Sequence, residues 1–474
     1  MRKEDMNQDT IAAISTAPGV GGIAVVRVAG SEAFAIVDKI WRGRHLAECT
    51  SHSAHLGMII DPTSGDILDQ CVATVFKGPG SYTGDDTVEL SVHGSRYVQS
   101  ELLRLLIDNG CRLAEPGEFT RRAFVAGHLD LAEAEGVADL IAATSRNSHH
   151  IAMNQMRGHL SATLNDLRSR LLHLASLIEL ELDFSEEDVE FASRLELSRI
   201  TGEVMGILSQ LTKSFATARA IKDGVPMAIV GAPNAGKSTL LNTLVKEDRA
   251  IVSPIAGTTR DTIEDTIEIG GTLFRIIDTA GLRADPGDEI ETIGIERTTE
   301  AIKKARIVVW VVDPSSPEIL PDTYSVISGA LPDDASLIVA INKSDLYKPT
   351  DILSEVWEAE EKAEKILHIT ANTQQGILGL TDYLGQKIDK STLDTALLTN
   401  ARHYQAASLA LQSMANVDIA LQQYANQADN LNPIPLDLVA IDLRAAIHHL
   451  GEITGTITTP DILANIFAHF CIGK

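Results

Sequence analysis

The chain has 474 residues, too many for one hydrophobic core, and this length indicates roughly two to four domains. Its net charge of −25 excludes broad, non-specific binding to nucleic acid, because contacts with phosphates need a basic surface, but it does not exclude a local basic site. The 44% of hydrophobic residues is typical of a globular protein, and no apolar run approaches the roughly 18 residues that span a bilayer.

The start of the chain, Met1–Asp5, mixes charges and leads into no apolar signal core. The cysteines are scattered and form no Cys-x-x-Cys pair, a pattern typical of free thiols in a reducing compartment. They are Cys49, Cys71, Cys111 and Cys471. We therefore expect a cytoplasmic protein without a disulfide or zinc framework.

The first region, residues 1–120, alternates short strand-like runs with glycine and proline turns. Residues 23–28 are an apolar run that predicts a strand. In residues 87–93 apolar and polar side chains alternate, which is the pattern of a strand with one buried face. Turns are predicted near residues 18–19 and 78–80.

Residues 121–219 are predicted to be helical. Leucine and isoleucine recur at spacings of three and four between Leu160 and Leu182, with no proline among them. At 1.5 Å per residue, the stretch from Asn147 to Phe184 would reach roughly 55 Å if it formed one unbroken helix, and another helix is expected to begin near Arg194.

Residues 220–387 alternate strands and helices in the manner of a parallel α/β sheet. Helical periodicity returns over residues 397–428 and 436–450. The α/β unit is therefore predicted to be inserted into a helical domain whose two parts are residues 121–219 and 388–474. The fold class is multidomain, α/β plus α.

Gly231 to Ser238 reads Gly-Ala-Pro-Asn-Ala-Gly-Lys-Ser, which fits GxxxxGK[ST] between an apolar strand and a helix. The glycines let backbone N–H groups turn toward phosphates, and the following helix presents its positive end. We expect Lys237 to reach the β- and γ-phosphates of a nucleotide and Ser238 to ligate Mg²⁺.

Further motifs follow other strands of this sheet. In Asp278-Thr-Ala-Gly281, Asp278 is expected to hold the Mg²⁺ shell and the amide of Gly281 to sense the γ-phosphate. Asn342-Lys-Ser-Asp345 selects the base, because a carboxylate at Asp345 accepts from the N1–H and the exocyclic amine of guanine, whereas adenine presents an acceptor at N1. Residues 370–372 lie where another guanine-contacting loop belongs. These motifs predict a GTPase.

The group that drives hydrolysis is less evident. Thr259, in the loop of residues 253–261, is the expected switch threonine for Mg²⁺. Leu282 stands where many small GTPases carry a glutamine that orients the attacking water, so another group must act. On chemistry alone, Arg283 as an arginine finger and Glu291 as a water-polarising carboxylate both stay open.

The predicted GTP contacts come from five segments of the chain. They are Asn234, Ala235, Gly236, Lys237, Ser238, Thr239, Ser253, Pro254, Ile255, Ala256, Gly257, Thr258, Thr259, Asp278, Thr279, Ala280, Gly281, Asn342, Lys343, Asp345, Thr370 and Ala371.

Over essentially its full length the chain resembles the MnmE/TrmE family of tRNA-modification GTPases. The resemblance implies an N-terminal α+β domain (1–120) for folate binding and dimerisation, a discontinuous helical domain and an inserted Ras-like P-loop domain. The residues that carry it are Pro18-Gly-Val-Gly-Gly-Ile with Arg27, the Tyr82-Thr-Gly84 turn before Glu89, Pro116-Gly-Glu-Phe-Thr-Arg-Arg-Ala-Phe124, Gly257-Thr-Thr-Arg-Asp261, Ile293-Gly-Ile-Glu-Arg297 and the terminal Phe470-Cys-Ile-Gly-Lys474.

The resemblance also implies partners and a reaction. A homodimer, joined through the N-terminal domain, would work with an FAD-dependent partner protein in a heterotetramer. Together they would add an aminomethyl-type group, such as carboxymethylaminomethyl, to C5 of the wobble uridine of certain tRNAs. A 5-formyltetrahydrofolate or related one-carbon tetrahydrofolate would bind at Arg27, Glu89 and Lys474, and the family's lysine or arginine at one further contact is His128 here.

For hydrolysis the resemblance implies K⁺ in place of an arginine finger. Its ligands would be Asn234, Ser253, Ile255 and Thr258, and the family's water-polarising glutamate falls on Glu291. A K⁺ beside the phosphates supplies positive charge where negative charge develops in the transition state.

Three alternatives concern other residues and the function. Cys471 is either a thiol for the modification chemistry or a buried structural cysteine. The pairs His149–His150 and His448–His449 are predicted to be packed or solvated helix surface and no metal site, because neighbouring helical residues point about 100° apart. The alternative function is a regulatory RNA- or ribosome-associated GTPase switch without modification chemistry.

Overall fold

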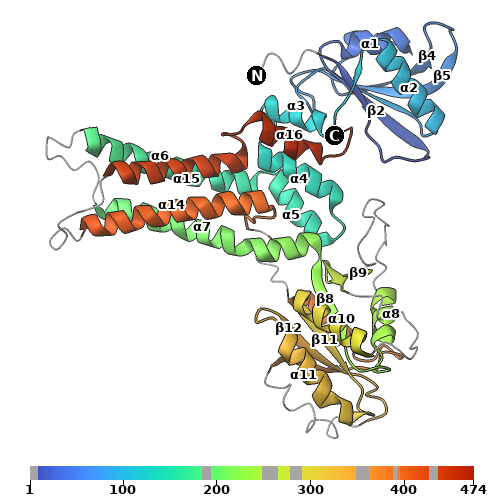
Figure 1. The fold of residues 1–474 in the computed structure, drawn as a ribbon. Helices are drawn as coiled ribbons and strands as arrows, with labels where there is room; N and C mark the ends of the chain where they lie inside the picture. The colour runs from blue at the N-terminus through green and yellow to red at the C-terminus, as the bar shows by residue number, and fades with distance from the viewer. Residues whose placement is uncertain are drawn as a thin grey trace. The chain divides into compact units, whose positions relative to one another are not determined.

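The computed structural model describes residues 9–183, 194–247, 265–277, 291–347, 362–387, 393, 395–425 and 436–473. The chain forms two compact units, shown in Figure 1 and considered one at a time. The first comprises Met1–Ile141, Asn154–Leu208 and Gln405–Lys474, and the second comprises Ala142–Met153 and Ser209–Tyr404. The three predicted domains, with their boundaries at residues 120, 220 and 387, stay a prediction.

A seven-stranded sheet forms most of the N-terminal part of the first unit. Its strands lie in the order β3-β4-β5-β6-β2-β1-β7, and all neighbours run antiparallel except β1 and β7. Helices α1 (Ala33–Ile40) and α2 (Arg96–Asp108) and the short η1 (Leu46–Glu48) lie between strands in sequence. The strands are β1 (Ile11–Ile14), β2 (Ile23–Ala29), β3 (Trp41–Arg42), β4 (Ser53–Ile60), β5 (Ile67–Phe76), β6 (Thr87–His93) and β7 (Arg112–Leu113).

The predicted strands at residues 23–28 and 87–93 are confirmed as β2 and β6. In β6, Val88, Leu90 and Val92 are buried in one core with residues of α1 and α2. Glu89 is only half-buried, since alternate side chains of a strand point to opposite faces. It lies directly across from Arg27 of β2.

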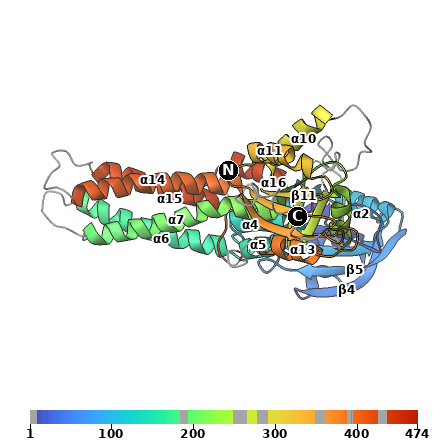
Figure 2. The same ribbon diagram turned by 90° about the horizontal axis from the view of Figure 1, so that it is seen from below.

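The remaining helices of the first unit include four long ones. In Figures 1 and 2, α6, α7, α14 and α15 lie side by side. The leucines and the isoleucine of the predicted helical pattern are buried between residues 160 and 178. The helices are α3 (Glu118–Val125), α4 (Leu131–Ala142), α6 (His159–Asp183), α7 (Arg194–Asp223), α14 (Ala401–Ala425), α15 (Leu436–Thr454) and α16 (Pro460–Ala468). Of these, α4, α7 and α14 have a part in the second unit.

The stretch of residues 147–184 is not one unbroken helix. The segment is divided into α5 (Arg146–Met156) and α6, and Gly158 between them has a φ of 80°. A Cβ at this position would lie 2.6 Å from Oε1 of Glu133. A left-handed residue cannot continue a right-handed helix, so the glycine separates the two. The helix predicted to begin near Arg194 is confirmed as α7.

The second unit is built on a six-stranded sheet of order β13-β12-β11-β8-β10-β9, parallel except for the β9–β10 pair. The strands are β8 (Val225–Val230), β9 (Asp265–Ile269), β10 (Thr272–Ile276), β11 (Ile307–Val312), β12 (Ser336–Ile341) and β13 (Ala363–His368). The helices are α8 (Lys237–Glu247), α10 (Glu291–Lys304), α11 (Leu320–Ala330) and α13 (Ile377–Gln386), with the short η2 (Pro317–Ile319).

The central strand β11 is buried along its whole length. Val309 and Val311 belong to the core on one face of the sheet, while Val308, Trp310 and Val312 belong to the core on the other. A strand covered on both faces reads as a continuous apolar run, as this one does. It fixes the edge of the sheet at which the loops after β8, β11 and β12 emerge.

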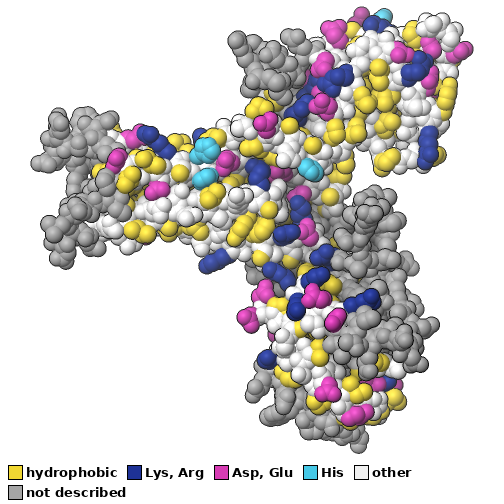
Figure 3. Space-filling model, viewed as in Figure 1, with side chains coloured by type: hydrophobic (Ala, Val, Ile, Leu, Met, Phe, Trp, Pro, Cys, Tyr) yellow, Lys and Arg dark blue, Asp and Glu magenta, His cyan; other side chains and the backbone are white. Residues whose placement is uncertain are grey.

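The described residues carry charges of both signs. On the face seen in Figure 3, basic and acidic side chains are interspersed over each unit, and no broad basic tract is seen there among them. None of the helices in the described ranges is long and apolar enough to cross a membrane. All four cysteines are free, as predicted.

Candidate nucleotide site and other predicted sites

The loop between β8 and α8 has the backbone that GxxxxGK[ST] predicts. Gly231, Asn234 and Gly236 have φ values of 148°, 62° and 100°. A Cβ on Gly231 would lie 2.3 Å from the carbonyl oxygen of Val311, and one on Gly236 would lie 2.2 Å from Nδ2 of Asn342. Both positions need glycine, because a Cβ would collide with these atoms. The two glycines therefore let the loop approach the ends of β11 and β12.

Lys237 begins α8 and turns back over the loop. Its Nζ donates hydrogen bonds to the carbonyl oxygens of Gly231 (2.9 Å) and Ala232 (2.8 Å). Burial lowers the pKa of Lys237. The ammonium thus lies beside the N-terminus of α8, where backbone N–H groups and the helix dipole favour an anion.

The side chain of Asn342 joins the loop before α8 to the loop after β13. Its Nδ2 donates to the carbonyl oxygen of Ala235 (2.8 Å), and its Oδ1 accepts from the N–H of Ala371 (3.0 Å). The hydroxyl of Thr243 donates to the carbonyl oxygen of Ala371 (3.0 Å), which ties α8 to the same loop. Three sequence-distant predicted segments therefore meet at one edge of the parallel sheet.

The loops that would hold a base are also fixed by backbone contacts. The N–H of Ser344 donates to the carbonyl oxygen of Ile369 (3.1 Å), and that of Thr370 donates to Gln375 (2.8 Å). Asp345 directly follows Ser344 in the chain and is exposed, so its carboxylate is open to a ligand. Asn234 and Ser238 are exposed and Thr239 is half-buried.

Several predicted contacts lie outside the described residues. They are the segments 253–259 and 278–281, together with Lys474. Glu291 is the first residue of α10, and its side chain is likewise outside the described part.

A second predicted site gathers around Arg27. Its guanidinium pairs with Glu89 (Nη2–Oε1, 2.8 Å), and its Nη1 donates to the carbonyl oxygen of Gly473 (3.5 Å). Its Cζ lies 5.1 Å from the ring centre of Tyr82 and 5.4 Å from that of Phe119. The two rings come from segments far apart in sequence, and sequence analysis did not assign them to the site.

His128 lies near the turn that contains Tyr82. A Cβ on Gly84 would be 3.0 Å from Nε2 of His128, and His128 itself is exposed. The end of the chain reaches the same domain, because the hydroxyl of Ser15 donates to the carbonyl oxygen of Gly473 (2.9 Å). Arg27, Glu89 and the residue before Lys474 are thus brought together.

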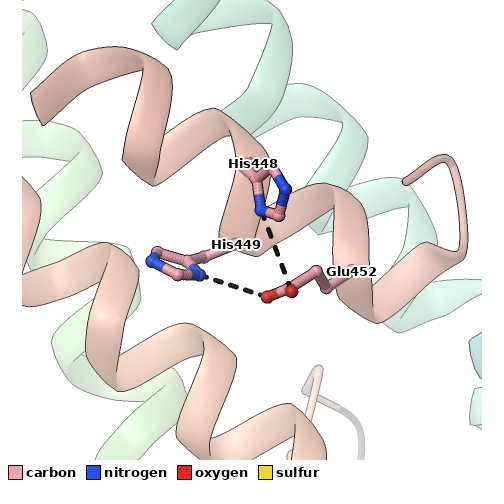
Figure 4. A group of neighbouring side chains, drawn as sticks. All are labelled: His448, His449 and Glu452. Atoms are coloured by element: carbon pink, nitrogen blue, oxygen red, sulfur yellow. Dashed lines mark hydrogen bonds and ion pairs between the residues drawn. The ribbon is translucent and has the colours of Figure 1, made fainter. Parts of the chain in front are cut away.

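Two interpretations from the sequence need correction. Cys471 is exposed, so the interpretation as a buried structural cysteine is wrong. His448 and His449 do converge, on Glu452: Nδ1 of His449 lies 3.1 Å from one carboxylate oxygen and Nδ1 of His448 lies 3.8 Å from the other (Figure 4). Glu452 is four and three residues away, at spacings that face one another on a helix. The contacts of both histidines with the Glu452 carboxylate explain why the three side chains lie together.

Comparisons with known proteins agree along the whole chain. The family model described as GTP-binding protein TrmE N-terminus matches residues 10–128, and the model described as MnmE helical domain matches residues 131–471. The tRNA modification GTPase MnmE of Flavobacterium johnsoniae is 45% identical over 479 residues, covering 99% of this chain and 100% of its own. MnmE of Christiangramia forsetii is 46% identical over 484 residues, covering 98% of this chain and 99% of its own.

Among solved structures, Era of Aquifex aeolicus bound to GDP.AlF4− is 24% identical and covers 40% of this chain and 66% of its own. Its TM-score of 0.26 is too low to add to the argument. The assignment therefore stands on the family models, the full-length relatives and the site.

The parallel sheet, the GxxxxGK[ST] loop and the Asn-Lys-x-Asp loop define a P-loop GTPase, an enzyme that hydrolyses GTP. The family models and the relatives then specify which one. The chain belongs to the MnmE family of tRNA modification GTPases.

Proposed function

We propose that this protein couples GTP hydrolysis to the addition of an aminomethyl-type group, such as carboxymethylaminomethyl, to C5 of the wobble uridine of certain tRNAs. An FAD-dependent partner protein shares the reaction in a heterotetramer, in the cytoplasm. The observation that carries the proposal is the Asn342 bridge, which joins two of the loops proposed to bind GTP, in a chain whose full-length relatives are tRNA modification GTPases.

The phosphates of GTP bind at the start of α8. Lys237 and the N–H groups of residues 234–239 contact the β- and γ-phosphates. Gly231 and Gly236 let this loop pack closely against Val311 and Asn342. Ser238 and Thr259 would ligate Mg²⁺, and Asp278 would hold the shell of ligands around the ion. When bound, the ion neutralises charge on the transferred phosphoryl group. The amide of Gly281 contacts the γ-phosphate.

The guanine base binds at Asp345. Its carboxylate accepts from both guanine donors, while Thr370 and Ala371 line the neighbouring loop. Support comes from the contacts that hold this loop, namely the Asn342 amide and the Ser344–Ile369 hydrogen bond. A rigid loop favours recognition, because less conformational freedom is lost on binding.

Hydrolysis uses K⁺ and Glu291. Asn234, Ser253, Ile255 and Thr258 would hold K⁺, which would supply the charge of an arginine finger, and Glu291 would orient the water in place of a glutamine. Asn234 is exposed, in the left-handed conformation, within the loop that precedes α8, so it is open to an ion there. Pairing of two GTPase domains would activate this hydrolysis.

A one-carbon tetrahydrofolate binds around Arg27, Glu89, His128 and Lys474. The Arg27 guanidinium lies near two aromatic rings, an arrangement suited to a ligand with an aromatic ring system and carboxylates. Cys471 is exposed and lies two residues before Gly473, which contacts Arg27. Its thiol is therefore the candidate group for the modification chemistry.

The chain forms a homodimer through its N-terminal domain. Leu56 of β4 and Val72 of β5 are directly paired across the sheet and are 67% and 36% exposed. Ile23 and Ile67 of the same sheet are 69% and 56% exposed. Apolar side chains gathered on an exposed sheet favour burial against another surface. Sedimentation at the monomer mass at micromolar concentration would contradict this proposal.

GTP turnover should be faster in KCl than in NaCl at equal ionic strength, because only the larger, more easily dehydrated ion fits the proposed ligands. Asn234→Ala should remove this difference and keep nucleotide affinity.

Glu291→Ala should lower single-turnover hydrolysis in KCl by about 10²- to 10⁴-fold, the usual contribution of a general base, with GTP affinity unchanged. Equal parental rates in the two salts would reject the K⁺ site, and near-parental turnover of Glu291→Ala would reject its role.

Cells that lack this protein should lose the modified wobble uridine in mass spectra of digested tRNA. Expression of the parent should restore it, and Asp345→Asn should not, because an amide cannot accept from both guanine donors. The mutation should weaken GTP binding by about 2–3 kcal/mol. If wobble uridines are normal without the protein, the regulatory-switch function takes the place of this one.

Arg27→Ala should abolish binding of 5-formyltetrahydrofolate, since it removes the cation that faces both rings. His128→Lys should bind the ligand more tightly than the parent, because the lysine places a positive charge where the family carries a lysine or arginine. Fluorescence titration measures both. Parental affinity in Arg27→Ala would show that folate binds elsewhere or not at all.

A further inference from the structure

Lys343 adopts an unusual backbone conformation between two residues of the nucleotide site. Its φ is 58°, in the left-handed region that residues other than glycine rarely occupy. Asn342 on one side makes the bridge described above, and Asp345 follows two residues later. A backbone that departs from its preferred conformation persists only where neighbouring contacts hold it. Lys343 therefore needs an anchor.

That anchor is Asp313, the residue directly after the buried strand β11. Its Oδ2 accepts a hydrogen bond from Nζ of Lys343 at 2.5 Å. Its Oδ1 accepts from the backbone N–H of Ser315 (3.0 Å) and from the Ser315 hydroxyl (2.7 Å). Both oxygens are thus engaged, and the side chain is only 9% exposed.

The carboxylate of Asp313 is also held by contacts other than the one with Lys343. The Ser315 contacts form a local turn in which an aspartate accepts from the residue two positions on. Burial alone would raise the pKa of Asp313, but the hydrogen bonds from Lys343 and Ser315 outweigh it and hold the pKa below its usual value. Asp313 is therefore charged at neutral pH and offers a rigid acceptor at the end of the central strand.

We propose that Asp313 is a positioning residue for guanine recognition: it anchors Lys343 and so holds the following carboxylate of Asp345 where it can accept from both donors of the base. The inference rests on the proposed placement of guanine at Asp345. Asp313 acts through Lys343 and does not itself contact the nucleotide.

The competing explanation is that the ion pair only stabilises the domain. The positioning role and the purely stabilising role predict different base selectivity. Inosine diphosphate lacks the exocyclic amine of guanine, so the ratio of GDP to IDP affinity reports whether Asp345 is correctly placed. A loss of stability alone would lower the melting temperature and leave this ratio unchanged in the folded protein.

The experiment compares the full-length parent with Asp313→Asn, Lys343→Met and the double variant in Mg²⁺ buffer. Dissociation constants for fluorescent GDP and IDP are measured, and melting temperatures establish that each variant is folded. Lys343→Met keeps the apolar stem and removes the ammonium. Asp333→Asn is the matched control, because Asp333 is an exposed aspartate of the same unit.

Asp313→Asn should weaken GDP binding about tenfold, as expected for one charge-assisted contact, and should lower the GDP-to-IDP ratio. The double variant should bind GDP no more weakly than Lys343→Met, since the two residues act through one contact. Asp333→Asn should match the parent.

A parental ratio in folded Asp313→Asn, or losses that multiply in the double variant, would overturn the inference. If Asp313→Asn does not fold, Lys343→Met tests the same contact from its exposed end, and an unchanged ratio there would overturn it too. A parent that does not distinguish GDP from IDP would instead reject the placement of guanine at Asp345.

Discussion

The amide of Asn342 is the interaction on which the nucleotide site depends. It satisfies the carbonyl oxygen of Ala235 and the N–H of Ala371, and all three residues are buried. A buried backbone group left without a partner costs about 1–3 kcal/mol, so the two loops are strongly held to this side chain. Gly236 allows the approach, because any Cβ there would meet Nδ2 of Asn342. The loop before α8 and the loops after β12 and β13 are therefore held together.

The frame for this bridge is the apolar sheet of the second unit. β11 is buried on both faces, and its neighbours β8 and β12 run parallel to it, so their following loops emerge at one edge. Ligands of open α/β sheets bind at this edge. Two lysines make contacts at this edge. Lys237 donates to the backbone carbonyl oxygens of Gly231 and Ala232. Lys343 donates to the side chain of Asp313. Family membership says which reaction the site serves, and the geometry says how the site is held.

Much of this could be predicted from the sequence, and the failures have physical reasons. Motif spacing between strand-like runs located the phosphate loop, and alternation located β6. The break at Gly158 was not predicted, because it precedes Leu160, where the leucine periodicity begins, and that periodicity carries no sign of a left-handed glycine. The contact of Glu452 with His448 and His449 was missed because the two histidines were compared only with each other. Tyr82 and Phe119 reach Arg27 through long-range packing, which no local pattern encodes.

The contacts of Asn342 should hold the loops of the proposed nucleotide site in place before any nucleotide binds. Amide hydrogen exchange of the nucleotide-free parent measures this, because exchange reports how often a backbone hydrogen bond opens. The amide of Ala371, a loop residue, should exchange as slowly as the amide of Val339 in the buried strand β12. Exchange of Ala371 as fast as that of an exposed loop amide such as Gln374 would contradict it.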